Sequence, residues 1–539
     1  MPLDREMGDR PPPSPGDLAV SRARLIGIAT AMGHALRRGA VSPNIAERAD
    51  CSTAVFDAEG RLVVQAEHIP VHLGSMPASV QSALSWLGTT GHKVDDETHV
   101  VLNDPFSGGT HLNDVTVVSP VLIDGRVVAW LANRAHHADV GGPTPGSLSV
   151  AHTELFGEGF CIPPTLYSPD LVRLFAANSR GPQERTADLS AQIGANRVGR
   201  SELTAAVGPL TEMFGALSRC FDAQHAYARR RVQRLLAPHL NKTAAATGEL
   251  NIGAINATVA CTVGVIGDES QLQLIVDWSE SSDQTDSSVN AVRAISTSAV
   301  SYALRCIFDP GLPAGFGVDS SIQILTRPGS VVDAIRPCAV GAGNVEVSQL
   351  LAQVAMRAFE QLRESQKRSE SPATMNNLII GSGSQVYYET MASGQGAFAD
   401  ADGATAMHTG MTNTQNTPIE ALERAYPFRV VEYRVARGSG GQGQHCGGDG
   451  MVRTIETLQR ATVTVIGSHR TRGASGANGA AGGMPGEDVV VRSDGSRVRL
   501  DGASTVTLEP GDRITVVTPS GPGWNAPVEA STSPRQPPT

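Results

Sequence analysis

Potential metal ligands are concentrated in three short segments in the first third of the chain. The segments are QAEHIPVHLG (65–74), LNDPFSGGTHLNDVTVV (102–118) and NRAHHADVGG (133–142), and together they hold five of the fourteen histidines. Protein metal sites use neutral imidazoles and carboxylates that converge from several elements. The concentration of both side-chain types predicts a metal or catalytic site within these segments.

The spacing His111-x-x-Asp114 and a later pair, His136 and His137, offer the required convergence. A set of nitrogen and oxygen ligands suits Mn²⁺, Zn²⁺ or Fe²⁺ better than an ion that prefers thiolates. The competing interpretation is that histidines beside glycine and aspartate are only solvated turn residues. Three polar loops that each follow an apolar strand favour a site, because a rigid sheet presents functional groups in this way.

Short strands must position these residues. A hairpin is predicted about Asp124-Gly125, the strongest turn signal in the region. The strands themselves are predicted from β-branched runs separated by turn residues, at 52–57, 61–66, 99–104, 115–123 and 126–133.

Helices are predicted from apolar residues that recur at a period of about 3.6. One runs from Asp17 to about Arg38, where Gly39 can end it, and MPASVQSALSWL has the same spacing. Apolar residues recur at helical spacing again from about residue 170. Two further helical stretches are predicted at 291–308 and 346–363.

The pattern as a whole predicts an α+β, multi-domain protein. It has a β-rich N-terminal domain with the metal site, a helical middle segment and a β-rich C-terminal region dense in glycine. The predicted segments are a disordered N-terminus (1–16), a mixed α/β domain (17–169), a helical segment (170–245), an α+β domain (246–400), a β-rich region (401–525) and a disordered tail (526–539).

Composition narrows the class of partner. The 539 residues carry a formal net charge of −10, which disfavours nucleic acid and anionic membranes as partners because both need clustered positive charge. The seven cysteines form no CxxC pair, and no apolar run is long enough to cross a membrane. We therefore expect a cytoplasmic protein whose main partner is neither nucleic acid nor a membrane.

Four runs of sequence carry a resemblance to a known family. SPNIAERADCSTAVFD, QAEHIPVHLGSMPASV, VVLNDPFSGGTHLNDVTVVSPV and NRAHHADVGGPTPGS resemble the signature of the hydantoinase B/oxoprolinase family. The resemblance continues through AANSRGPQERTADLSAQIGAN and NTPIEALERAYPFRVVEYRV and covers about residues 17 to 525. The family includes N-methylhydantoinase B subunits, the corresponding half of 5-oxoprolinase, lactam hydrolases and the large subunits of acetone and acetophenone carboxylases.

The resemblance implies a metal and a partner. In the acetone carboxylase branch a His-x-x-Asp pair and a later His bind manganese, and this motif falls on His111, Asp114 and His136. An acidic residue of the ERADCS stretch, Glu47 or Asp50, would complete the ligand set; we assign Glu47 as the ligand and a catalytic role to Asp50. ATP would be used by a separate actin-like ATPase subunit of the hydantoinase A type, in a hetero-oligomer, which agrees with the lack of a nucleotide-binding motif here.

The expected reaction is the ATP-dependent hydrolysis of a cyclic amide or imide. A metal-bound water would attack a carbonyl that the partner has activated, while His137 or Glu67 moves protons. Two alternatives remain open: a ketone carboxylase of the acetone or acetophenone carboxylase type, and a non-catalytic scaffold subunit.

The chain departs from the family pattern in two glycine-rich loops. Where the family reads RGGDG and a TPGGGG-type turn, this chain has Cys446-Gly447-Gly448-Asp449-Gly450 and TPSGPGW (518–524). The substitutions leave the predicted metal ligands untouched and bear on the identity of the substrate.

Overall fold

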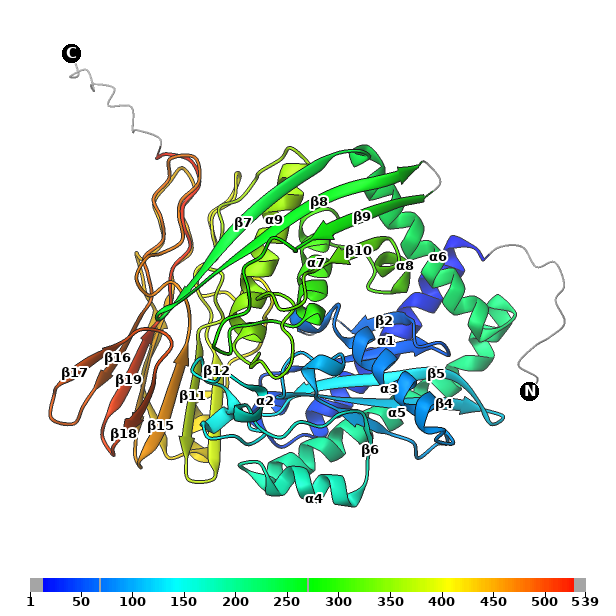
Figure 1. Cartoon of the computed structure of the whole chain (residues 1–539), viewed down its shortest axis with the longest axis horizontal. Helices are drawn as coiled ribbons and strands as arrows, with labels where there is room; N and C mark the ends of the chain where they lie inside the picture. Colours follow the sequence, from blue (N-terminus) through cyan, green and yellow to red (C-terminus); the bar gives the residue numbers. More distant parts are fainter. Residues whose placement is uncertain (1–12, 67–68, 269–270, 528–539) are drawn as a thin grey trace, which may run out of the picture.

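The first helix begins slightly earlier than the sequence predicts. The structure, a computed structural model, describes residues 13–66, 69–268 and 271–527 (Figure 1). Helix α1 (Pro15–Gly39) starts inside the predicted disordered N-terminus, because Ser14 Oγ accepts a hydrogen bond from Asp17 N at 3.1 Å and Pro15 occupies the first helical position. Residues 1–12, and 528–539 of the predicted disordered tail, lie outside the described residues.

A six-stranded antiparallel sheet carries the three ligand-rich segments. Its strand order is β2-β1-β5-β4-β3-β6. The predicted hairpin is confirmed: β4 and β5 pair on either side of Asp124 and Gly125, which both have the positive φ that tight hairpin turns favour. The strands are β1 (Cys51–Asp57), β2 (Leu62–Ala66), β3 (Val100–Leu102), β4 (Asp114–Ile123), β5 (Arg126–His136) and β6 (Thr165–Leu166).

Helices cover both faces of this sheet. Alternate residues of β5 belong to different clusters: Leu131 packs with α1 and α5 (Pro182–Phe214), whereas Trp130 and Ala132 pack with α3 (Met76–Thr90). This alternation follows from the two-residue period of a strand. Because both faces are covered, the strands that hold the ligands are held rigidly.

The middle of the chain is helical, as predicted, through α4 (Pro169–Ala177), α5 and α6 (Leu217–Leu236). Strand β7 (Thr243–Ile252) already begins within the predicted helical segment 170–245. It pairs with β8 along its whole length, and this pairing overrides the helix propensity of its alanines. The proposed domain boundaries themselves stay a prediction.

A second sheet has the order β10-β9-β8-β7 and lies across two long helices in Figure 1. Helices α7 (Arg293–Ile307) and α9 (Ser348–Leu362) pack together beneath it, and they match the two predicted stretches 291–308 and 346–363. A π-helical turn, Gly343–Val347, leads directly into α9. The remaining strands are β8 (Ile255–Asp268), β9 (Gln271–Asp277) and β10 (Ile322–Leu325).

The C-terminal third folds into two further sheets that share one hydrophobic core, which includes Leu378, Val463 and Ile514. Their orders are β12-β11-β15-β18 and β13-β14-β19-β16-β17. The strands are β11 (Asn377–Ser382), β12 (Gln385–Thr390), β13 (Phe428–Val435), β14 (Met451–Thr457), β15 (Ala461–Ile466), β16 (Glu487–Val491), β17 (Arg497–Leu500), β18 (Thr505–Leu508) and β19 (Arg513–Val517).

Short helices complete the fold: α2 (Pro43–Ala46), α8 (Phe316–Asp319), α10 (Ile419–Ala425) and the 3-10 turns Pro70–His72, Pro105–Ser107, Pro145–Ser147, Leu155–Gly157 and Ala237–His239. The chain is an α+β, multi-domain protein, as predicted. In the part of the chain that the structure describes, no helix is long and apolar enough to cross a membrane.

Candidate metal centre

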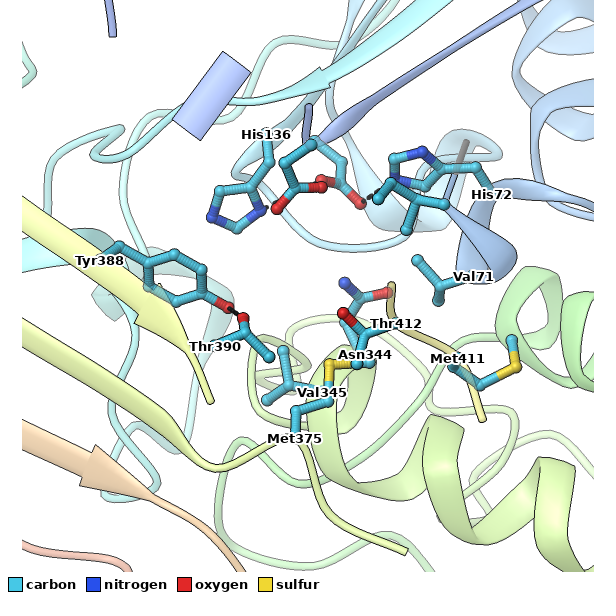
Figure 2. Close-up of a pocket in the computed structure, with 13 residues that line it drawn as sticks. Val71, His72, His136, Asn344, Val345, Met375, Tyr388, Thr390, Met411 and Thr412 are labelled. Carbon is cyan, nitrogen blue, oxygen red and sulfur yellow. Dashed lines mark hydrogen bonds and ion pairs between the residues drawn. The ribbon is translucent and has the colours of Figure 1, made fainter. Parts of the chain in front are cut away.

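The hairpin β4–β5 brings two of the predicted ligands together. Asp114 is the first residue of β4, His136 is the last residue of β5, and the two are partners in the strand register. His136 Nδ1 lies 3.3 Å from Asp114 Oδ1. In Figure 2, His136 lies at the edge of a pocket. The pairing of the strands therefore fixes this contact.

His111 reaches the same carboxylate oxygen from the turn that precedes β4. The turn is closed by a hydrogen bond from Asp114 N to His111 O at 3.0 Å, and it brings His111 Nε2 to 3.2 Å from Asp114 Oδ1. Potential ligand atoms of His111, Asp114 and His136 all lie within 4.8 Å of one another, and all three residues are buried. The structure thus brings together the three residues that the sequence singles out.

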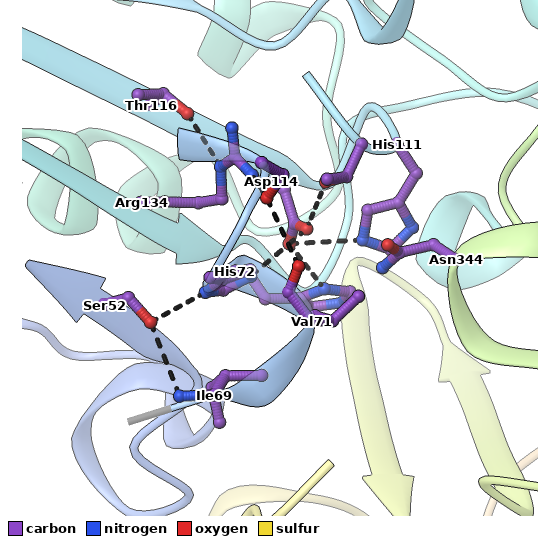
Figure 3. Close-up of polar contacts among 12 residues, drawn as sticks. Ser52, Ile69, Val71, His72, His111, Asp114, Thr116, Arg134 and Asn344 are labelled. Atoms are coloured by element: carbon purple, nitrogen blue, oxygen red, sulfur yellow. Dashed lines mark hydrogen bonds and ion pairs between the residues drawn. The ribbon is translucent and has the colours of Figure 1, made fainter. Parts of the chain in front are cut away.

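A further histidine, His72, completes the surroundings of Asp114 (Figure 3). Its Nε2 lies 3.3 Å from Asp114 Oδ2, and its Nδ1 lies 2.9 Å from Ser52 Oγ. Thr110 Oγ1 donates a hydrogen bond to the same Oδ2 at 2.6 Å. One carboxylate oxygen therefore faces His111 and His136, while the other is held by His72 and Thr110. His72 stands in one of the three ligand-rich segments, but its role was not predicted.

Electrostatics keep the carboxylate charged and one imidazole neutral. Burial raises the pKa of Asp114, but electrostatic interactions with His111 and His72 and hydrogen bonds from His111 and His136 outweigh burial and hold that pKa well below its usual value. Burial lowers the pKa of His136, which favours its neutral form. An ionised carboxylate and neutral imidazoles are the forms that bind a metal.

The free ring nitrogens fit a divalent cation. Among the residues that the structure describes, His111 Nδ1 and His136 Nε2 have no hydrogen-bond partner, and His111 Nε2 has only the Asp114 carboxylate beside it, although all three atoms are buried. Buried polar atoms without partners are uncommon in proteins and call for an explanation such as an ion. Two imidazoles and one carboxylate are a donor set typical of Zn²⁺, Mn²⁺ or Fe²⁺ sites that keep open positions.

The cluster faces a small pocket, called the metal pocket below, with a cavity volume of about 20 Å³. One wall comes from residues 50–136 and holds the carboxylates and imidazoles, and the opposite wall comes from residues more than two hundred positions later and mixes polar and apolar side chains (Figure 2). The N-terminal wall includes Asp50, His72, Asp114 and His136, and the later wall includes Asn344, Val345, Met375, Tyr388, Met411 and Thr412.

Tyr388 of β12 positions His136 by stacking. The two rings are nearly parallel, with centroids 4.8 Å apart. On Tyr388 the buried Arg48 lies with its guanidinium carbon 4.8 Å from the ring centroid, and Arg48 also donates a hydrogen bond to Tyr388 O at 2.9 Å. The Tyr388 hydroxyl donates to Asn377 Oδ1 at 2.8 Å. The later part of the chain therefore fixes the orientation of His136, a candidate ligand that the first sheet carries.

The structure does not bring Glu47 to the cluster. Glu47 caps the C-terminus of α2 and is exposed, whereas the metal cluster is buried. After it, Ala49 adopts a positive φ of 56°, and Asp50 turns inward to line the pocket with only 8% of its surface exposed. Asp50 O also accepts a hydrogen bond from His136 N at 3.0 Å. Of the two acidic residues, only Asp50 lines the pocket, and it is not among the residues whose potential ligand atoms lie within 4.8 Å of one another.

His137 lies apart from the pocket. Its Nε2 is 3.0 Å from Gln192 Oε1 of α5, and its ring meets Phe175 edge-on at 5.4 Å. Neighbouring residues at a strand end point to opposite faces, so His137 faces the helical layer when His136 faces the pocket. The structure therefore gives no support to proton transfer by His137. Glu67, the other predicted shuttle, lies outside the described residues.

The two atypical glycine-rich loops contact each other instead of the metal pocket. Gly521 N donates to Gly448 O at 2.9 Å, and His445 and Trp524 form a short antiparallel bridge. The described residues that line the metal pocket include none from either loop. His445 Nδ1 forms an ion pair with Asp402 Oδ1 at 3.7 Å.

A family model and several known proteins match most of this chain. The family model of hydantoinase B/oxoprolinase matches residues 14–527. The chain is 33% identical to an uncharacterized protein of Methanocaldococcus jannaschii over 93% of this chain and 89% of that protein. It is 32% identical to 5-oxoprolinase 1 of Arabidopsis thaliana over 94% of this chain, but it spans only 42% of that relative's length. It is also 26% identical to caprolactamase subunit beta of Pseudomonas jessenii, over 89% of this chain and 85% of that subunit.

Solved structures have the same fold. ATP-dependent caprolactamase from Pseudomonas jessenii aligns with a TM-score of 0.83 at 24% identity, covering 95% of this chain and 91% of that chain. Acetone carboxylase in its nucleotide-free form aligns with a TM-score of 0.82 at 17% identity, covering 96% of this chain and 76% of that chain. With a family model that matches nearly its whole length, the chain belongs to the hydantoinase B/oxoprolinase family.

Proposed function

We propose that this chain is the catalytic B-type subunit of an ATP-dependent enzyme that hydrolyses the C–N bond of a cyclic amide or imide. The observation that carries the proposal is the buried cluster of His111, Asp114 and His136, whose ligand atoms lie within 4.8 Å of one another beside a pocket. Relatives named 5-oxoprolinase and caprolactamase subunit beta support this class of substrate.

The bound metal supplies Lewis acidity, which polarises a carbonyl oxygen and makes water more acidic. His111, Asp114 and His136 would hold it. The chain's other residues then have defined tasks: His72 and Thr110 keep the Asp114 carboxylate oriented, and Tyr388 keeps the His136 ring in place.

The lining of the pocket offers both polar and apolar partners to a cyclic amide. Asn344 Oδ1 is buried in the pocket wall without a hydrogen-bond partner among the described residues, so it can accept a hydrogen bond from the ring N–H of an amide. Val345, Met375 and Met411 offer an apolar surface to the hydrocarbon part of the ring. The Asp50 carboxylate lines the same pocket and is placed to take a proton from the attacking water.

An amide carbonyl resists attack because of resonance, and ATP is the means of activating it. We propose that an actin-like ATPase of the hydantoinase A type phosphorylates the carbonyl oxygen and forms a hetero-oligomer with this chain. Two observations support a separate ATPase: the sequence lacks a nucleotide-binding motif, and a relative that spans nearly the same length is named as a subunit.

Co-expression of the chain with its cognate A-type subunit tests the proposal. The complex is incubated with ATP and hydantoins, 5-oxoproline or lactams, and separately with aryl ketones and bicarbonate. Ring-opened acids that form only with ATP support the hydrolase. A carboxylated ketone as the only product would replace it with the alternative carboxylase, and purified protein without stoichiometric metal would favour a scaffold.

A further inference from the structure

A second cavity lies behind the later wall of the metal pocket. Its cavity volume is about 150 Å³. We call it the Gln353 pocket, and its lining includes Tyr302, Cys306, Gln349, Gln353, Arg368 and Phe398. Three segments of chain, 344–353, 372–375 and 409–412, contribute residues to both cavities. The two cavities therefore share a wall.

Two glutamines present N–H groups at the floor of the Gln353 pocket. Gln349 and Gln353 are only 3% and 7% exposed, and within the described residues neither Nε2 has an acceptor. The orientation of the Gln349 amide follows from its partner: the backbone N–H of Met411 donates to Gln349 Oε1 at 3.2 Å, so the oxygen is taken and the NH₂ group is left over. At Gln353, Oε1 similarly faces Arg368, whose NH1 donates to it at 3.5 Å.

Arg368 adds a guanidinium to these donors. Its Nε pairs with Glu360 Oε1 at 3.1 Å, while its NH2 group has no hydrogen-bond acceptor among the described residues. Glu370, the other nearby carboxylate, pairs with Arg357 at 3.0 Å. The floor of the pocket therefore offers three sets of N–H donors, and the side-chain oxygens of the two glutamines are already used.

We propose that the Gln353 pocket binds an oxyanion, the carboxylate or phosphoryl group of a small molecule. A group that only accepts hydrogen bonds satisfies all three donors at once, and a guanidinium adds a charge-assisted hydrogen bond. Ring-opening of an amide yields a carboxylate and ATP use yields phosphate, so both forms of this chemistry are available to the proposed reaction. The site itself does not depend on the metal or on hydrolysis.

Two glycines beside these donors leave no room for a side chain. A Cβ atom on Gly410, which has a φ of +68°, would overlap the Gln349 amide oxygen, and a Cβ on Gly396 would overlap Ser369 O. The atypical loop 518–524 supports the same wall, since Ala397 N donates to Pro522 O at 2.9 Å. The donors are thus held in place from several sides.

Titration of the purified full-length chain with sodium acetate and, separately, with orthophosphate tests the site without ATP or a cyclic amide. Gln349→Glu and Gln353→Glu keep one side-chain oxygen in place. They replace the NH₂ donor with a second oxygen and add a negative charge. Gln361→Glu adds the same charge at an exposed position of the same helix and is the matched control. We expect at least one anion to bind to the wild type and the control, with affinity at least about tenfold weaker in both pocket variants.

The anion that binds more tightly identifies the source, a carboxylate or a phosphoryl group. Arg368→Lys keeps the charge beside Glu360 but removes the planar donor, so it should weaken binding even if a glutamine variant does not fold. A selenate ion located by anomalous diffraction should lie against Gln353 and Arg368. Equal binding by all variants, no binding by the wild type, or selenate only at the metal cluster would overturn the proposal. Metal content should not change in any variant, which separates this test from that of the metal centre.

Discussion

The two walls of the metal pocket differ in how they are built. The N-terminal wall takes its polar groups from residues 50 to 136, on adjacent strands and turns of one sheet. The later wall takes Asn344, Tyr388 and the methionines from separate segments of a helix, a strand and loops. The first wall carries the ligands, and the second positions a ligand and shapes the space. Chemistry is therefore local in the sequence, whereas shape is distributed.

Removing ligands from the first wall should have the largest effect. His111→Ala and Asp114→Ala should each abolish stoichiometric metal binding and lower ATP-dependent turnover by about a thousandfold or more, because metal polarisation contributes several kcal/mol to the transition state. Metal analysis and steady-state rates of the complex measure this, with circular dichroism as the control for folding. Full metal content and turnover in both variants would refute the assignment.

Asp50 and Glu47 allow a sharper test of the same wall. Asp50→Asn should lower turnover by about 10–100-fold, the usual effect of losing a group that supports a metal site. Glu47→Gln, three residues earlier and exposed, should leave turnover and metal content unchanged. Competition with a chelator gives the metal affinity of each variant. The reverse ranking would restore Glu47 as the fourth ligand.

A change in the second wall should act through position and not through ligation. Tyr388→Leu removes the ring that stacks on His136 at 4.8 Å and should weaken metal affinity by roughly tenfold. Tyr388→Phe keeps the ring and loses only the two hydrogen bonds of the hydroxyl, to Asn377 and from Thr390, so it should restore most of that affinity. If the leucine variant binds metal as tightly as the wild type, the second wall does not position His136.

The smallest effect on activity is expected from a change at His137, which contacts α5 and does not line the pocket. His137→Leu leaves Gln192 Oε1 without its partner, which should lower the free energy of unfolding by about 1–3 kcal/mol. Turnover per metal ion should stay within about twofold of the wild type, because His137 does not line the pocket. Thermal unfolding and rates normalised to metal content separate the two quantities. Lost turnover with full metal content would instead reinstate His137 as a proton shuttle.

Local patterns predicted the first wall well. The hairpin that pairs Asp114 with His136 follows from β-branched strands and the turn Asp124-Gly125, signals that lie within one short stretch. The choice between Glu47 and Asp50 could not be read from the sequence, since it depends on the positive φ of Ala49 after a single helical turn.

The roles of residues in the second wall could not be predicted from the sequence. Tyr388 lies in a buried strand whose sequence looks like ordinary core, and only the packing of β12 against the first sheet gives it a role at His136. The same holds for Gln349 and Gln353: a glutamine on a helix is usually exposed, and only tertiary packing reveals that these two are buried beside a cavity.

Met375 and Met411 have a consequence for how such a protein can diverge. Methionine is unbranched and polarizable, so it adapts to differently shaped neighbours at small cost. Both methionines lie in the wall that carries none of the clustered ligands. Substitutions of these two methionines would therefore reshape the pocket while leaving His111, Asp114 and His136 in place.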